Sequence, residues 1–170
     1  MSESEAVDDR VAPDDTGLEA DRRRAEALRA LGPGHKRFAD YAIKLRDYGI
    51  GTLIKQWRTG ELRPIVLRKT RITLPPPPPW WSDDHVSGVI AEAVTRSVEP
   101  FMQSAVLQGG WQPGGGASIK TYFIGSCYFT FATDYRREHR AEMRASRMLQ
   151  GQKPDLELDV IRYLHNTVGP

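Results

Sequence analysis

The sequence has a single cysteine, Cys127, among its 170 residues. One thiol excludes a disulfide within the chain and any zinc site built from cysteines. The sequence also lacks an apolar run of about 18 residues, which a membrane-spanning helix requires. It begins with MSESEAVDDR, which is acidic and polar, whereas a signal peptide is basic and then apolar. We therefore expect a cytoplasmic protein with no part in a membrane, and we interpret Cys127 as a small packed residue on an apolar helix face.

Sequence patterns for catalysis are also missing. The four histidines are scattered and show none of the spacings that metal sites use. Gly114, Gly115 and Gly116 form a triple glycine, but the lysine and the Ser or Thr of a phosphate-binding loop do not directly follow it. Neither a nucleophile elbow nor a dinucleotide fingerprint is present. We expect no enzymatic activity, no cofactor and no bound metal ion.

Charge is divided unevenly along the chain. Residues 1–21 contain eight acidic residues and one arginine, a net charge of −7; because the whole chain carries +2, the remainder carries +9. Acidic segments with few apolar residues cannot bury enough surface to offset the entropy of ordering. We therefore predict a disordered acidic tail over residues 1–21. Such a tail keeps a protein soluble, and it can also compete with nucleic acid for a basic surface.

Helix-forming residues dominate the next part, which we interpret as an N-terminal helical extension over residues 22–72. Ala, Leu, Arg and Glu fill residues 21–31, and Gly32-Pro33-Gly34 ends that helix. A longer helix is predicted over residues 35–59, where apolar residues recur at helical spacing, and we expect it to pack on the core. Residues 63–72 alternate basic and apolar side chains, which predicts an extended connector or a short strand.

A run of prolines, Pro75–Pro79, comes next and favours a polyproline II spacer about 15 Å long. We interpret residues 73–81 as a polyproline linker rather than as a ligand for a proline-binding module. Ser82 is a typical N-cap, and apolar residues then recur at three- and four-residue steps from Val86 to Ser97. This pattern predicts an amphipathic helix after the linker.

The most informative pattern lies between Trp111 and Arg137. A triple-glycine loop is followed by Ser118, a helix-capping residue, and then by an aromatic-rich helix that continues into a row of arginines. Flat side chains stack on bases and fixed positive charges hold phosphates, so this order favours binding of single-stranded or melted nucleic acid. The alternative is purely structural, because aromatic residues at helical spacing also form cores and arginines near a helix end also face solvent.

The same segment resembles region 2 of bacterial RNA polymerase sigma factors of the sigma-70 family, in particular the extracytoplasmic-function type. Those proteins carry a run of the form Asp-Pro-x-x-Gly-x-Ser-Leu/Phe-Arg-Thr/Ala-Trp/Tyr-Leu, followed by a helix that ends in Arg-Arg. The stretch GASIKTYFIGSC, from Gly116 to Cys127, is similar to the core of actinobacterial sigma-like proteins, and the resemblance covers residues 81–147. The matching residues are Pro113, Gly116, Ser118, Ile119, Lys120, Thr121, Tyr122 and Phe123, with Arg136 and Arg137 closing the helix.

The resemblance implies an all-α protein, in which residues 82–149 form a sigma region 2-like helical bundle. It also implies that the chain associates with RNA polymerase core and contacts the −10 promoter element by capturing bases of the melted non-template strand. The implied DNA-binding residues are Trp111, Ser118, Lys120, Tyr122, Tyr128, Arg136, Arg137 and Arg140. Glu92 and Arg96 match the motif that binds the β′ clamp of the polymerase, although an i,i+4 ion pair on a solvated helix face explains them as well.

Three residues depart from the family pattern. Gly88 stands where an acidic residue is usual, Phe129 where asparagine is usual, and Thr133 where aspartate is usual. These departures favour an alternative, a degenerate sigma-fold interaction module or transcription regulator that binds a partner such as an anti-sigma-like regulator without recognising a promoter. Residues 150–170 are interpreted as a C-terminal tail with a short helix. This leaves no room for region 4, the second DNA-binding domain of such factors, so we expect an incomplete sigma-like factor.

Overall fold

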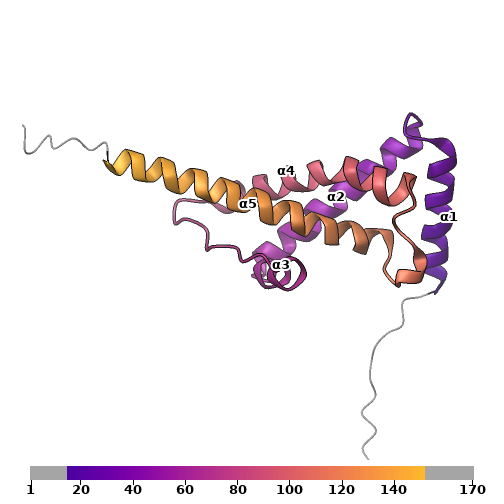
Figure 1. Cartoon of the computed structure of the whole chain (residues 1–170), viewed down its shortest axis with the longest axis horizontal. Helices are drawn as coiled ribbons and strands as arrows, with labels where there is room; N and C mark the ends of the chain where they lie inside the picture. Colours follow the sequence, from indigo (N-terminus) through magenta and orange to yellow (C-terminus); the bar gives the residue numbers. More distant parts are fainter. Residues whose placement is uncertain (1–14, 152–170) are drawn as a thin grey trace, which may run out of the picture.

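The structure is a computed structural model that describes residues 15–151, and this part of the chain is helical with no strand. The all-α prediction is confirmed for these residues, and none of their helices is long and apolar enough to cross a membrane. The assignment to a sigma region 2-like bundle remains a prediction. In chain order (Figure 1) the elements are α1 Asp15–Leu31, α2 Lys36–Arg58, α3 Leu62–Thr70, α4 Asp83–Phe101, the π-helical turn η1 Met102–Leu107, the 3-10 turn η2 Pro113–Gly115, and α5 Ile119–Gly151.

The core of the molecule lies where α2, α4 and α5 pack together. Leu45 and Leu53 of α2 are buried on either side of Gly49. A Cβ atom added to Gly49 would lie 2.8 Å from Cγ1 of Val94 on α4 and 2.9 Å from Cε1 of Phe123 on α5. The missing side chain therefore allows α2 to approach both neighbours. The predicted helix over residues 35–59 is confirmed, and so is its packing on the core.

Helix α1 crosses the end of the bundle at which α5 begins (Figure 1). Two of its side chains form hydrogen bonds with the backbone of other elements. The Asp21 carboxylate accepts a hydrogen bond from the backbone N–H of Ile119, at 3.0 Å, and Arg29 Nε donates to the carbonyl oxygen of Val106, also at 3.0 Å. Because Ile119 is the first residue of α5, Asp21 places a negative charge at the positive end of that helix dipole.

The prediction of a disordered tail that extends to Asp21 is therefore wrong for its last residues. Helix α1 begins at Asp15, and Asp21 is buried, with its carboxylate also paired to Arg24 at 2.9 Å. The acidic composition of this segment suggests disorder only as long as its carboxylates lack partners, and Asp21 has two. Residues 1–14 of the predicted tail lie outside the described residues.

The segment predicted to be an extended connector, residues 63–72, is mostly helical instead. Leu62 and Val66 lie one turn apart in α3 and both are fully buried, so the apolar residues follow a helical rather than an alternating pattern. Pro64 is tolerated because it lies in the first turn, where its missing N–H has no helical partner. The helix ends at Arg71, which adopts a left-handed conformation with φ of 62°.

The proline-rich segment packs against the helices and does not hold two lobes apart. Leu74 is buried, and its carbonyl accepts a hydrogen bond from Arg63 at 3.0 Å. The hydroxyl of Tyr135 on α5 donates to the carbonyl of Pro75 at 2.9 Å. The ranges predicted as an extension, a linker and a region 2-like domain therefore share one core, because α2 packs on α4 and α5 and Leu74 is buried in the same cluster.

Helix α4 begins as the sequence predicts. The hydroxyl of Ser82 accepts a hydrogen bond from the backbone N–H of His85, at 3.1 Å, and caps the helix. Near its other end α4 contains Pro100 and then widens into the π-helical turn η1. The N–H of Gly110 donates to the carbonyl of Ser104, at 2.9 Å, which directs the chain back toward α5.

Candidate nucleic-acid interface

The loop that precedes α5 is held from inside by Trp111. Its side chain is buried, and its indole N–H donates to the carbonyl of Ala117 at 2.8 Å. Gly116 has φ of 72°, a conformation that favours glycine, and Ser118 then caps α5 by accepting from the N–H of Thr121 at 3.1 Å. The predicted cap is confirmed. Trp111 was expected to contact DNA, but its burial makes it a support for the loop.

The inner face of α5 belongs to the core. Cys127 is fully buried, and burial raises the pKa of its thiol to about 12, which agrees with its interpretation as a packed residue. Tyr128 is also buried, and its hydroxyl exchanges hydrogen bonds with the side-chain amide of Gln56 on α2, at 3.0 and 3.2 Å. Tyr128 was expected to contact DNA, by stacking on bases or by packing beneath them; because its ring is buried, it offers no surface for stacking.

The outer face of α5 carries exposed aromatic residues followed by arginines. Tyr122 is 48% exposed and Phe129 is 51% exposed. Arg136 and Arg140 are exposed farther along the same helix. Because an α-helix repeats every 3.6 residues, positions seven apart share a face, and Tyr122, Phe129 and Arg136 follow this spacing. Phe129 was not among the residues expected on this face, although its place midway between Tyr122 and Arg136 in the sequence indicates it.

Lys120 does not belong to this face. Its ammonium group lies 5.0 Å from the centre of the Tyr48 ring on α2, in a cation–π contact. Although Lys120 and Tyr122 lie only two positions apart, a helix turns by about 200° over that distance. The structure therefore keeps Tyr122 with Arg136 and Arg140 and separates Lys120 from them.

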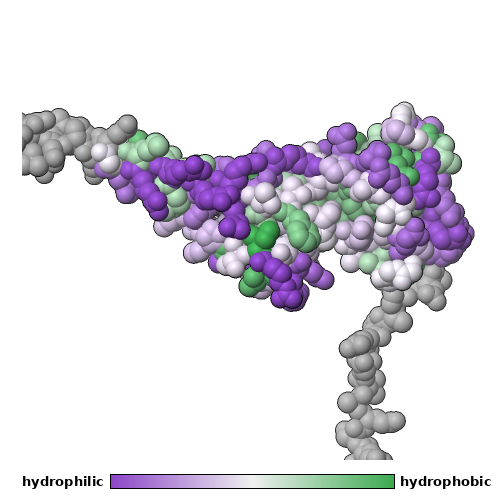
Figure 2. Space-filling model, in the orientation of Figure 1, coloured by the Kyte–Doolittle hydropathy of each residue, from purple (hydrophilic) through white to green (hydrophobic). Residues whose placement is uncertain are grey.

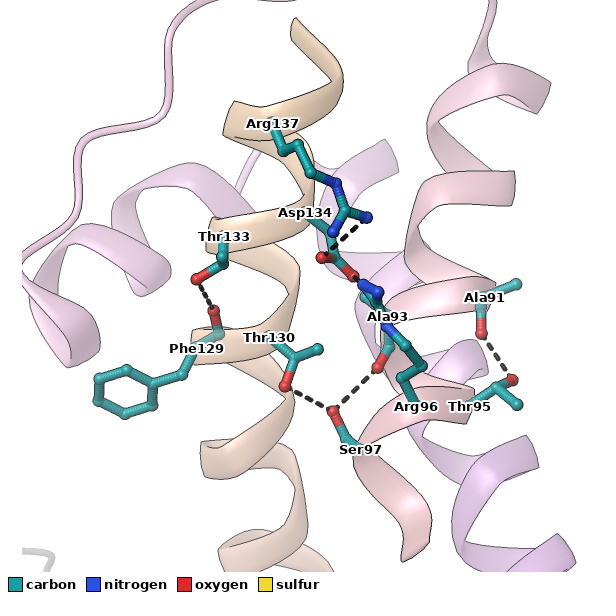
Figure 3. Close-up of polar contacts among 10 residues, drawn as sticks. All are labelled: Ala91, Ala93, Thr95, Arg96, Ser97, Phe129, Thr130, Thr133, Asp134 and Arg137. Atoms are coloured by element: carbon teal, nitrogen blue, oxygen red, sulfur yellow. Dashed lines mark hydrogen bonds and ion pairs between the residues drawn. The ribbon is translucent and has the colours of Figure 1, made fainter. Parts of the chain in front are cut away.

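A cluster of charged residues connects α4 to α5 (Figure 3). Asp134 is buried on α5 and binds two arginines: Arg96 of α4, in a direct ion pair, and Arg137, whose Nη2 lies 3.3 Å from a carboxylate oxygen of Asp134. Hydrogen bonding to Asp134 raises the pKa of Arg96. Arg96 thus pairs with Asp134 of the neighbouring helix, and not with Glu92 as the i,i+4 alternative predicted. Glu92 is exposed.

Next to this cluster, a groove of about 500 Å³ runs between α4 and α5. Tyr122 and Phe129 line its α5 side, Pro100 and Phe101 line its α4 side, and Lys69 reaches its edge from α3. Figure 2 shows apolar surface where α3 meets α5, then hydrophilic surface along most of the arm of α5, and some apolar surface again near the end of that arm. Between residues 15 and 151, no group of three or more His, Cys, Asp and Glu side chains is placed to hold a metal ion.

On the other side of the charged cluster, the seam between α4 and α5 is acidic. Asp84 and Glu92 of α4 and Glu138 of α5 line a shallow hollow there. A surface of this charge repels phosphates and suits a basic protein partner. The same pair of helices therefore presents two surfaces of different charge.

Comparison with protein-family models, with curated proteins and with solved structures gives no match.

Proposed function

We propose that this protein is a sigma region 2-like factor that binds single-stranded promoter DNA through the outer face of α5. The observation that supports this function best is the order of exposed residues on that face: Tyr122 and Phe129 first, then Arg136 and Arg140. Aromatic rings stack on bases of any sequence, and arginines bind the phosphates that follow. The resemblance of residues 116–127 to sigma factors adds the −10 element and its melted non-template strand as the target.

The proposed polymerase contact lies on the acidic part of the seam, around Glu92. This surface is separated from the outer face of α5 by the charged cluster, in which Arg96 and Arg137 both bind Asp134. Because Arg96 is engaged by Asp134, we assign the contact with the β′ clamp to Glu92 and its acidic neighbours rather than to Arg96. DNA and polymerase would then bind separate surfaces of one rigid helix pair.

The alternative function is an interaction module without promoter recognition. It is favoured by the burial of Trp111 and Tyr128, two of the residues that the resemblance assigns to DNA, and by the engagement of Arg137 with Asp134. Such a module would use the same acidic surface for a partner and would bind nucleic acid weakly or not at all.

Binding of a fluorescent single-stranded oligonucleotide, measured by anisotropy at several salt concentrations, separates these functions. The double variant Arg136→Glu, Arg140→Glu should flatten the slope of log K against log salt by about 1.4 units, at about 0.7 per phosphate for single strands. A matched control is Arg23→Glu with Arg37→Glu, which makes the same change of charge at exposed positions away from this face. Absence of salt-dependent binding by the unmodified protein would contradict the DNA-binding function.

The polymerase contact is tested by co-purification with RNA polymerase core. Glu92→Lys should abolish co-purification and leave DNA binding unchanged, because it reverses a charge on an exposed surface outside the core. Glu26→Lys, at an exposed position of α1, serves as the control. Co-purification without any DNA binding would favour the interaction module.

A further inference from the structure

We infer that the C-terminal segment, residues 152–170, docks in an apolar groove beside α3. This groove, called the α3 groove below, has a volume of about 550 Å³ and lies where the end of α2, α3 and the proline-rich segment meet. Its apolar lining comes from Trp57, Leu62, Leu67, Leu74 and Pro77. The docking is a contact within the chain, and it does not depend on the proposed binding of DNA or polymerase.

The α3 groove is a fixed part of the fold. Leu62 and Leu74 line it from the side of the core, where both are buried. Arg63 of α3 donates to the carbonyl of Leu74, at 3.0 Å, and so holds the proline-rich segment against α3. Leu67 also lines the groove, but 45% of it is exposed. An exposed leucine beside an apolar hollow offers surface that a second apolar element can cover.

Charge around the α3 groove indicates an acidic occupant. Five exposed cations lie on α3 and directly beside it: Arg58, Arg63, Arg68, Lys69 and Arg71. No carboxylate between residues 15 and 151 forms an ion pair with any of them. Glu61 is the single acidic residue in the sequence from 51 to 75. An occupant that combines apolar side chains with carboxylates would therefore cover Leu67 and complement these cations.

The C-terminal segment has this chemistry. Three carboxylates fall within five residues, at Asp155, Glu157 and Asp159. Three apolar residues recur at three-residue steps, which places them on one face of a helix: Leu158, Ile161 and Leu164. Residues 1–14 are acidic as well, but they contain no leucine, isoleucine or aromatic residue with which to fill an apolar groove. The C-terminal segment is therefore the better occupant of the two.

The length of the C-terminal segment allows it to reach the α3 groove. Tyr135 of α5 lies next to the groove, because its ring centre is 6.1 Å from that of Trp57. Helix α5 continues beyond α3 as an arm (Figure 1), and Gly151 comes 16 positions after Tyr135. This part of the helix is about 24 Å long. Seven extended residues, 152–158, also span about 24 Å. A chain that turns back along α5 therefore brings Leu158 and the residues after it to the groove.

Paired cysteines in the full-length chain test this docking. Leu67→Cys places a thiol in the α3 groove, and Ile161→Cys places the second in the C-terminal segment. The rate of disulfide formation under mild oxidation is followed by non-reducing electrophoresis, and the linked peptides are identified by mass spectrometry. Cys127 can stay, because burial raises the pKa of its thiol to about 12 and keeps it unreactive.

The matched control pairs Ile161→Cys with Thr133→Cys. Thr133 is exposed and lies on α5 two positions before Tyr135, so its distance from Gly151 along the helix is similar, but it does not line the α3 groove. A segment that is tethered but not docked would reach Leu67→Cys and Thr133→Cys at comparable rates. Thr73→Cys, at another exposed position that lines the groove, provides a second pair if Leu67→Cys disturbs the fold.

The pair at Leu67 should form its disulfide at least about tenfold faster than the pair at Thr133, because docking raises the effective concentration of one thiol near the other. Reversal of the three acidic charges, by Asp155→Lys, Glu157→Lys and Asp159→Lys together, should remove this advantage. Leu158→Ser with Leu164→Ser should remove it as well. High salt should reduce it, because the ion pairs are exposed and therefore screened.

Three outcomes would overturn the docking. The first is equal rates for the pairs at Leu67 and Thr133. The second is a fast reaction at Leu67 that neither the charge reversal nor the leucine substitutions slow. The third is disulfide-linked dimers of the chain that carries Leu67→Cys alone, which would make the α3 groove an interface between two copies. None of these results bears on DNA binding, which the anisotropy measurements test separately.

Discussion

Asp134 is the residue on which most of the local electrostatics depends. Its buried carboxylate binds Arg96 of α4 and Arg137 of α5 (Figure 3). A buried charge is tolerated only where opposite charges and hydrogen bonds compensate for its desolvation. The resemblance to sigma factors assigns Arg96 to the polymerase and Arg137 to DNA, yet both guanidinium groups are engaged within the protein. Asp134 therefore determines how much positive charge this part of the surface presents.

We expect Asp134→Asn to destabilise the protein by about 1.5–3 kcal/mol, the range for hydrogen bonds to charged groups. Asparagine keeps the shape but cannot neutralise two arginines. Urea unfolding measures this loss. The same variant should bind single-stranded DNA more tightly, because it removes the negative charge that neutralises Arg96 and Arg137. The control Asp47→Asn removes an exposed partner of Arg46 and should change stability by less than about 0.5 kcal/mol. Unchanged stability in Asp134→Asn would show that the cluster is not structural.

At the scale of elements, α2 shows that the effect of a glycine on stability depends on what it faces. Gly49 and Gly51 lie two residues apart in this helix, and glycine is unfavourable at both positions on intrinsic grounds. Gly49 faces Val94 and Phe123 at close range, whereas Gly51 faces open space. Only Gly49 is needed for the approach of α2 to α4 and α5. The proposed interface depends on this approach, because the core fixes the position of α5.

Alanine at these two positions should have opposite effects. Gly49→Ala should destabilise the protein by about 1–3 kcal/mol, because its Cβ forces Val94 and Phe123 to move within a packed core. Gly51→Ala should stabilise it by about 0.5–1 kcal/mol through helix propensity. Thermal unfolding of both variants measures the difference. If both variants had a higher Tm than the unmodified protein, the close packing of α2 would not be a requirement of the fold.

At the scale of the whole molecule, acidic and basic residues lie on separate surfaces. The seam between α4 and α5 is acidic around Glu92 and apolar with a basic edge at Lys69, with the Arg96–Asp134–Arg137 cluster between them. The N-terminal sequence adds a separate acidic segment, since residues 1–14 contain five acidic residues and one arginine, a net charge of −4. Acidic residues near a basic surface compete with phosphates for it, more strongly at low salt.

Two deletions test how the acidic N-terminal segment affects DNA binding and stability. Removal of residues 1–14 should leave Tm unchanged, because every contact described for α1 remains. It should tighten binding to single-stranded DNA, because it removes acidic residues that compete with phosphates. Removal of residues 1–21 should lower Tm by about 2–8 °C, since it takes away the Asp21 carboxylate that caps α5. Full-length Asp21→Ala is the matched control for the lost cap. If both deletions had the same Tm, the contact between Asp21 and Ile119 would contribute nothing to stability.

The sequence by itself determined where most helices lie. The residues that decide this are local: Ser82 and Ser118 cap the helices that follow them, and apolar spacing marks α2, α4 and the first half of α5. Such signals act within a few residues, so they can be recognised in the sequence without knowledge of the fold. The exception is α3, which contains basic and β-branched residues and was predicted to be extended; it is helical because this conformation buries both Leu62 and Val66 in the core.

Only the tertiary structure decided which of the candidate residues reach solvent. Trp111 and Tyr128 lie under the loop and against α2, Lys120 turns to Tyr48, and Tyr122 remains exposed. These outcomes depend on partners distant in sequence, such as Gln56, which lies 72 residues before Tyr128. Residue type and spacing allow an aromatic side chain to bind a base or to fill a core. The choice is made by which helix packs against it.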